Sequence, residues 1–205
     1  MDFKIRKKDY IFSMQQRIGS TKSGSDLYYE MYLNDNILLE DMIESYKKII
    51  KSEGLDYMES MEMVVTSIQS IPYVLVSLDN CPKSQFGLNF IDDCKPQKNP
   101  SGCCGLVVPF GVYTPIEFAV QRTADCDTRS LFAYTILKKL GFDVAVMVSK
   151  ELSHSVLGVS FPKTPSDGKT GNIGNAKRYF LWELTTFGPV LGQDIDGNDW
   201  KIALN

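Results

Sequence analysis

The sequence predicts a single α+β domain, with helices in the first half of the chain and antiparallel strands in the second. Apolar residues recur at helical three-to-four spacing between residues 36 and 70, and again after residue 126. Short runs rich in Val, Phe, Tyr and Trp follow residue 141, and polar turns containing glycine separate them. The 205 residues suffice for one domain with a substantial core, and no internal repeat divides them.

The composition is that of a globular protein, with 43% hydrophobic, 23% charged and 11% aromatic residues. A formal charge of -3 provides no long-range attraction to nucleic acid or acidic membranes, so we expect no nucleic-acid partner. No apolar run approaches the roughly 18 residues that span a bilayer. We therefore expect no direct membrane insertion by this chain.

The N-terminal part divides into an arm and a helical region. Residues 1–35 are predicted to be an extended arm that includes a flexible connection rich in Ser and Gly. Residues 36–76 form the helical part, in which one helix ends at Gly54 and a second runs over 56–70, before Pro72.

Residues 77–112 are predicted to be a long loop, which in a compact domain is usually functional or cross-linked. This region holds four of the five cysteines, and three states are open for them: disulfides, free thiols or a metal site. Their spacing fits zinc poorly, and no metal is expected. The four cysteines are Cys81, Cys94, Cys103 and Cys104.

Disulfides would imply an oxidising compartment. We therefore expect the protein in the cell envelope or outside the cell, as a domain of a larger anchored protein. The N-terminus has no apolar signal-peptide core, which is weak evidence because the chain can be a fragment.

Residues 113–205 are predicted to form the core. Thr114 caps a short helix, and Asp125 caps a longer one that begins at Cys126 and ends at Gly141. The buried stripe of the longer helix is spaced i, i+3, i+4, i+7 from Ala133. Strands are expected over 142–149, 153–161, 177–187 and, as an edge strand, 200–205.

Cys126 lies between two aspartates, in "TADCDTR", at a helix N-terminus. The helix dipole favours a thiolate by about 0.3–1 kcal/mol. Asp125 and Asp127 oppose it by a comparable amount, so the helix alone does not activate the sulfur. An imidazole that accepts the proton would supply the missing element.

His154 is the single histidine of the chain, and it begins a strand expected beside the strand that follows the cysteine helix. A carboxylate usually orients such a ring, and the next strand supplies Glu183 in an apolar context. Arg178 and Lys201 are alternative partners for Glu183. The alternative for Cys126 and His154 is a purely structural role.

The ordered pieces "DCDTRSL", "SHSVLG" and "YFLWELTT" resemble the motifs of the transglutaminase-like superfamily over roughly residues 113–193. The resemblance implies a papain-like fold and a triad of Cys126, His154 and Glu183. Two features depart from the pattern: Ala124 stands where relatives often have Gly, and the acid is Glu rather than Asp. The superfamily includes peptidases, amidases, acyltransferases and inactive members.

The sequence thus predicts a thiol enzyme for acyl transfer or hydrolysis at an amide bond of a peptide or protein, without a cofactor. The backbone N–H of Cys126 and the side chain of Gln69, in "IQSIPY", are predicted to donate to the oxyanion. Asp127 and Trp182 are predicted to contact the substrate, although Trp182 also suits the core. The alternatives are an idle binding or scaffold module of a larger envelope protein and, third, a metal-binding domain.

Overall fold

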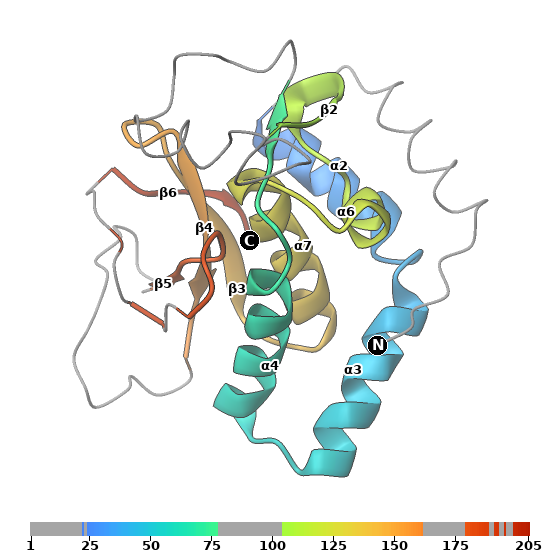
Figure 1. The fold of residues 1–205 in the computed structure, drawn as a ribbon. Helices are drawn as coiled ribbons and strands as arrows, with labels where there is room; N and C mark the ends of the chain where they lie inside the picture. Colours follow the sequence, from blue (N-terminus) through green and yellow to red (C-terminus); the bar gives the residue numbers. More distant parts are fainter. Residues whose placement is uncertain are drawn as a thin grey trace, which may run out of the picture.

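The protein is described by a computed structural model over residues 22, 24–77, 104–161, 179–188, 191–192, 195 and 199–205. Its centre is a four-stranded antiparallel sheet with the strand order β5-β4-β3-β6 (Figure 1). The strands are β3 (Val144–Ser149), β4 (His154–Val159), β5 (Phe180–Trp182) and β6 (Lys201–Leu204). The α+β class is confirmed, and β6 lies at a sheet edge as predicted.

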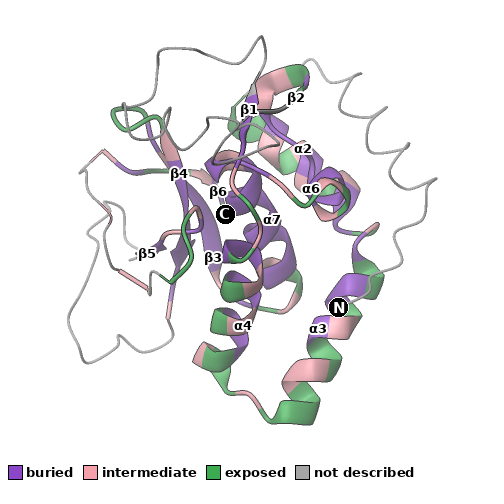
Figure 2. Cartoon of the chain, viewed as in Figure 1, coloured by how far each residue is buried: buried purple, intermediate pink, exposed green. Residues whose placement is uncertain are grey.

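Helix α7 (Cys126–Lys139) packs against β3 and β4 and is surrounded by other helices on its remaining sides. Figure 2 shows it buried along most of its length. The surrounding helices are α2 (Ser25–Asp35), α4 (Tyr57–Gln69) and α6 (Pro115–Gln121). Because α7 is covered on nearly all sides, its N-terminal cysteine is held in a fixed position within the core.

The predicted helix limits are confirmed where a capping residue sets them. Helix α3 (Glu40–Glu53) ends at Gly54, whose φ of 65° is the left-handed conformation that favours glycine. Asp56 and Glu59 form a capping box at the start of α4. Thr114 and Glu117 do the same for α6, and Asp125 caps α7. Helix α3 begins four residues later than predicted, at Glu40 instead of residue 36.

The prediction of an extended arm over residues 1–35 is wrong for its last third, because residues 25–35 form helix α2. The helix buries a narrow stripe, Leu27, Met31 and Asp35, spaced four residues apart. One of these three residues is an acid whose Oδ2 accepts the N–H of Ile116, 2.8 Å away. A stripe of two apolar residues and an acid is too weak a signal to predict a helix. Residues 1–21 lie outside the described part.

The predicted loop over 77–112 contains regular structure near its ends. Strands β1 (Leu75–Ser77) and β2 (Cys104–Val107) pair in parallel, and η1 (Pro109–Gly111) follows. The sequence reasoning missed this pair because its two strands are three and four residues long. Cys81, Cys94 and Cys103 lie outside the described residues, and so does the side chain of Cys104. The disulfide prediction therefore stays a prediction.

The sheet separates two apolar clusters, as the alternation of a strand requires. Val144, Val146 and Leu157 face the main core with the helices, while Ala145 and Met147 face a smaller cluster. On β5, Trp182 belongs to the main core and Leu181 to the smaller cluster, so this strand alternates in the same way. Glu183 follows directly at the end of β5.

Candidate functional site

Asp125 fixes the backbone at the start of α7, where Cys126 is the first helical residue. Its Oδ1 accepts the N–H of Thr128 at 3.1 Å, and its Oδ2 accepts the N–H of Val76 at 3.3 Å. The Asp125 carboxyl thus joins the cysteine helix to β1. The Cys126 residue is 7% exposed, and the backbone N–H of Ser155 on β4 lies close enough to the sulfur to favour its ionised form.

The surroundings of the thiol oppose its ionisation in this conformation. Burial raises the pKa of Cys126, and the carboxylates of Asp127 and Asp125 raise it further. The backbone N–H groups of Ser155 and Asp127 act in the other direction and are outweighed. Burial and the Asp127 charge also raise the pKa of Asp125 to about 7. Formation of a thiolate at Cys126 therefore requires a positive charge close to the sulfur.

His154 and Glu183 contact each other directly: Nε2 of the ring lies 2.7 Å from Oε2 of the carboxylate. The other carboxylate oxygen, Oε1, accepts the backbone N–H of Leu184 together with the N–H and hydroxyl of Thr185. Burial alone would raise the pKa of Glu183, but the bonds from His154 and Thr185 outweigh it and lower the pKa. Because Glu183 occupies Nε2, Nδ1 is the ring nitrogen left to exchange a proton with a thiol.

The turn before His154 is held by Asp199, which sequence reasoning missed. Asp199 accepts hydrogen bonds from the Ser149 hydroxyl and from the N–H groups of Lys150 and Glu151. Trp200 packs edge-on against the His154 ring at a centroid distance of 6.2 Å. The predicted edge strand was the signal for this contact in the sequence. Its pairing with β3 brings the adjacent residues Asp199 and Trp200 to the turn before His154.

Arg129 is fully buried and was also missed. Its guanidinium donates to the carbonyl oxygens of Ala124 (3.2 Å), Ile68 (3.4 Å), Leu184 (2.8 Å) and Ile71 (2.5 Å). These carbonyls belong to the segment before Cys126, the end of α4 and the segment after Glu183. One side chain therefore ties together the segments that carry the thiol and the acid.

The signal for this arrangement was present in the sequence. Arg129 lies four residues before Ala133, so the predicted stripe already placed it on the buried face of the helix. A buried guanidinium requires acceptors, and its five donors suit a set of carbonyls.

Two tyrosines lie close to the thiol. The Tyr28 hydroxyl, from α2, donates to Oδ1 of Asp127 at 2.9 Å. Tyr73 packs beside Arg129, whose Cζ lies 5.4 Å from the centre of the ring. Burial raises the pKa of both phenols, and a negative charge on Cys126 would raise it further. Neither tyrosine was predicted, because both come from segments assigned other roles.

Gln69 and Trp182 take structural positions in this conformation. Nε2 of Gln69 donates to the backbone carbonyl of Glu183 at 2.7 Å, so α4 contacts the residue that carries the acid. The oxyanion role of Gln69 stays a prediction. Trp182 is 2% exposed and lies in the main core, which leaves its substrate contact a prediction as well. Asp127 is partly exposed beside Cys126.

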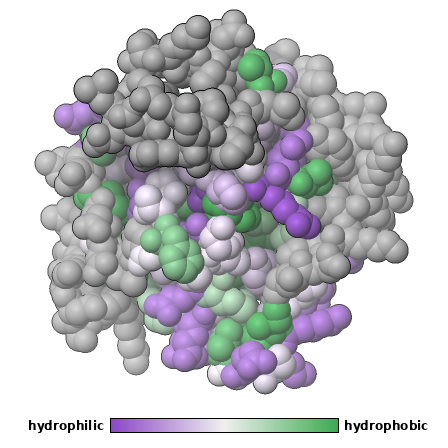
Figure 3. All heavy atoms as spheres, in the orientation of Figure 1, coloured by the Kyte–Doolittle hydropathy of each residue, from purple (hydrophilic) through white to green (hydrophobic). Residues whose placement is uncertain are grey.

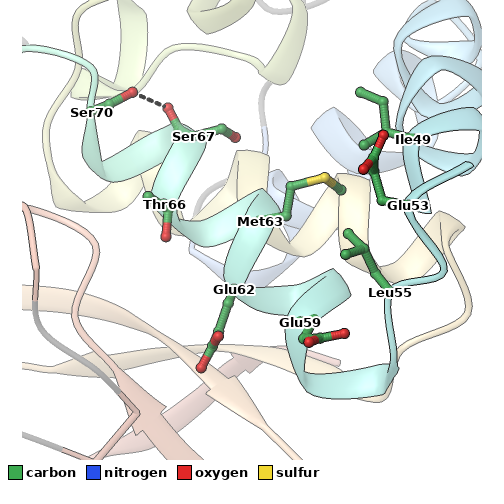
Figure 4. A pocket seen from close by; sticks show the side chains of 9 residues that line it. All are labelled: Ile49, Glu53, Leu55, Glu59, Glu62, Met63, Thr66, Ser67 and Ser70. Carbon is green, nitrogen blue, oxygen red and sulfur yellow. Dashed lines mark hydrogen bonds between the residues drawn. The ribbon is translucent and has the colours of Figure 1, made fainter.

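A pocket of about 580 Å³ lies between α3 and α4, away from these residues. Figure 4 shows Ile49, Leu55 and Met63 pointing into it, while Glu62 points away. In the face shown in Figure 3, hydrophilic residues gather at the lower end, where α3 and α4 meet, with hydrophobic ones among them. The pocket is lined by no member of the predicted triad.

Within the described residues, no group of three or more His, Cys, Asp or Glu side chains is arranged to hold a metal ion. None of the helices in the described ranges combines the length and apolar character that crossing a bilayer requires. Comparison with known proteins finds no matching family model, no similar curated protein and no similar solved structure.

Proposed function

We propose that the protein is a thiol enzyme of transglutaminase-like type, which transfers or hydrolyses an acyl group at an amide bond of a peptide or protein. Cys126 is the nucleophile, His154 the general base and acid, and Glu183 the residue that orients the ring. One observation carries the proposal: His154 lies 2.7 Å from Glu183, while the backbone N–H of the next residue, Ser155, lies near the Cys126 sulfur and favours its ionised form. The segments that carry the thiol, the imidazole and the carboxylate are distant in sequence, and their proximity in the fold supports the proposal.

The reaction follows from this placement. His154 takes the thiol proton at Nδ1, and the thiolate adds to the amide carbonyl carbon. The oxyanion that forms lies near the start of α7, where the backbone N–H of Cys126 is a donor. The imidazolium then gives its proton to the leaving amine, the carbon–nitrogen bond breaks and a thioester remains. Water attacks the thioester, His154 takes its proton, and the acid product and thiolate are released; an amine in place of water gives transfer.

The transglutaminase-like fold is supported by the arrangement of elements. The cysteine begins a helix that packs on an antiparallel sheet, the histidine begins one strand, and the acid follows the neighbouring strand. Glu183 instead of Asp keeps this contact with the ring, because its longer side chain places Oε2 at hydrogen-bonding distance.

A second candidate function is an idle binding or scaffold module. The observation that favours it is the state of the thiol, which is 7% exposed and whose pKa is raised by burial and by two carboxylates. A neutral, covered thiol does not attack an amide.

Alkylation by iodoacetamide distinguishes the two candidates. The rate at Cys126 is followed by peptide mass against pH in the wild type, His154→Ala and Glu183→Gln, with Ser52→Ala on the surface of α3 as the control. The enzyme hypothesis expects reactivity that persists below pH 7 and falls at least about tenfold in His154→Ala. If wild type and His154→Ala share one profile with the midpoint above about 8.5, the value of an ordinary thiol, the idle module is correct.

A further inference from the structure

The three carboxylates around the thiol differ in how many of their oxygens have a hydrogen-bond or ion-pair partner. Both oxygens of Asp125 accept backbone N–H groups, and both oxygens of Glu183 have donors or the His154 ring. Arg129, the buried cation nearby, directs its donors to four backbone carbonyls. Burial raises the pKa of Asp127, and the Tyr28 hydroxyl at Oδ1 and the charge of the nearby His154 ring act against it; no Lys or Arg of the described chain forms an ion pair with this carboxylate.

A second polar group beside Asp127 is the hydroxyl of Ser155. Ser155 is fully buried, and its Oγ makes no hydrogen bond of good geometry in the described structure. The same hydroxyl lies close enough to the Asp127 carboxylate to help lower its pKa, against the larger effect of burial. An unpartnered buried hydroxyl costs free energy unless a ligand or water satisfies it.

We propose that Asp127, Ser155 and Tyr28 form a subsite for a positively charged group of the substrate, a primary ammonium that lies next to the reacting carbonyl. The inference rests on the proposed function, because it names the class of substrate for the same thiol. An ammonium has three donors and no acceptor. The subsite offers the second oxygen of Asp127, the oxygen of Ser155 and the lone pairs of the Tyr28 hydroxyl, whose hydrogen already points to Asp127.

The subsite also links binding to reactivity. Asp127 is the carboxylate that most opposes ionisation of Cys126, after burial itself. An ammonium paired with Asp127 cancels this repulsion, so the substrate that fits also activates the nucleophile. Amides of free amino-terminal residues, or of short diamines, have the required group; an acidic residue at this place would be repelled.

Methanethiosulfonate reagents test the subsite without any turnover. The aminoethyl reagent is cationic, the methyl reagent is neutral, and both form a mixed disulfide with Cys126. We expect the cationic-to-neutral rate ratio to be about fivefold larger in the wild type than in Asp127→Asn, the factor that a partly exposed ion pair contributes. Asp41→Asn, an exposed aspartate on α3, removes the same charge elsewhere and is expected to keep the wild-type ratio.

A substrate pair completes the test. Two peptides that differ only in a free or an acetylated amino terminus, one residue from the scissile amide, are compared in the wild type and Asp127→Asn. Preference for the free amine that disappears in Asp127→Asn supports the subsite. Equal reagent ratios in the wild type and Asp127→Asn overturn it. Charge selectivity with no turnover of either peptide supports the subsite and counts against the proposed enzyme.

Discussion

Arg129→Met is expected to destabilise the protein strongly, because the guanidinium donates to four carbonyls of three separate segments. Each buried carbonyl left without a donor costs about 1–3 kcal/mol, and the relieved desolvation of the charge offsets part of the sum. Removing one partner from a buried charged network typically costs about 3–5 kcal/mol, which we take as the expected loss. Methionine retains most of the volume, so the loss reports the polar contacts.

Urea unfolding followed by circular dichroism measures this loss. With a slope of about 2 kcal/mol per M, the midpoint should fall by about 1.5–2.5 M. Lys139→Met, at the exposed end of the same helix, is the control and should shift it little. Arg129→Lys, which has fewer donors, should give an intermediate loss and serves if Arg129→Met does not fold. A loss below about 1 kcal/mol in Arg129→Met, equal to that of the control, would refute the assigned role.

Two further predictions concern the sheet and the helix cap. A Cβ at Gly158 would lie 2.8 Å from Cγ of Met147, so Gly158→Ala should cost about 1–3 kcal/mol in thermal unfolding; an unchanged melting temperature would contradict this packing. The raised pKa of Asp125 predicts that the contribution of this group to stability is fully present below its unfolded value of about 3.9 and is lost as pH rises through about 7. Asp125→Asn should flatten this decline in urea titrations at pH 4, 5.5 and 7, and an unchanged slope would assign the decline to other groups.

The sequence predicted those elements that local signals define. Helix ends are set by side chains or backbone conformations that act within a few residues, so they can be predicted without knowledge of the fold. The residues that set them here are Gly54, Asp56, Thr114 and Asp125. The contact between His154 and Glu183 also follows from local pattern, because two neighbouring antiparallel strands bring their ends together.

The features that escaped prediction depend on distant contacts. Helix α2 has only two buried apolar residues, Leu27 and Met31, and is held by packing on α6, α7 and β6. Asp199 acts on a turn 48 to 50 residues earlier in the chain, through a strand pairing that the sequence leaves open. Arg129 satisfies carbonyls up to 61 residues away. Periodicity assigns a residue to a face, but it does not identify the partners that lie across that face.

The position of Cys126 between two aspartates follows from the demands on the helix start. Asp125 is required as a cap, since its carboxyl satisfies N–H groups of both α7 and β1. That same carboxyl opposes a thiolate and so acts against the helix dipole, which favours one. Activation therefore has to come from outside the helix. His154 supplies a proton acceptor from β4, and a cation at Asp127 would remove the remaining repulsion. In the free protein His154 therefore provides the activation of the thiol, and a substrate cation paired with Asp127 adds to it by removing a negative charge beside the sulfur.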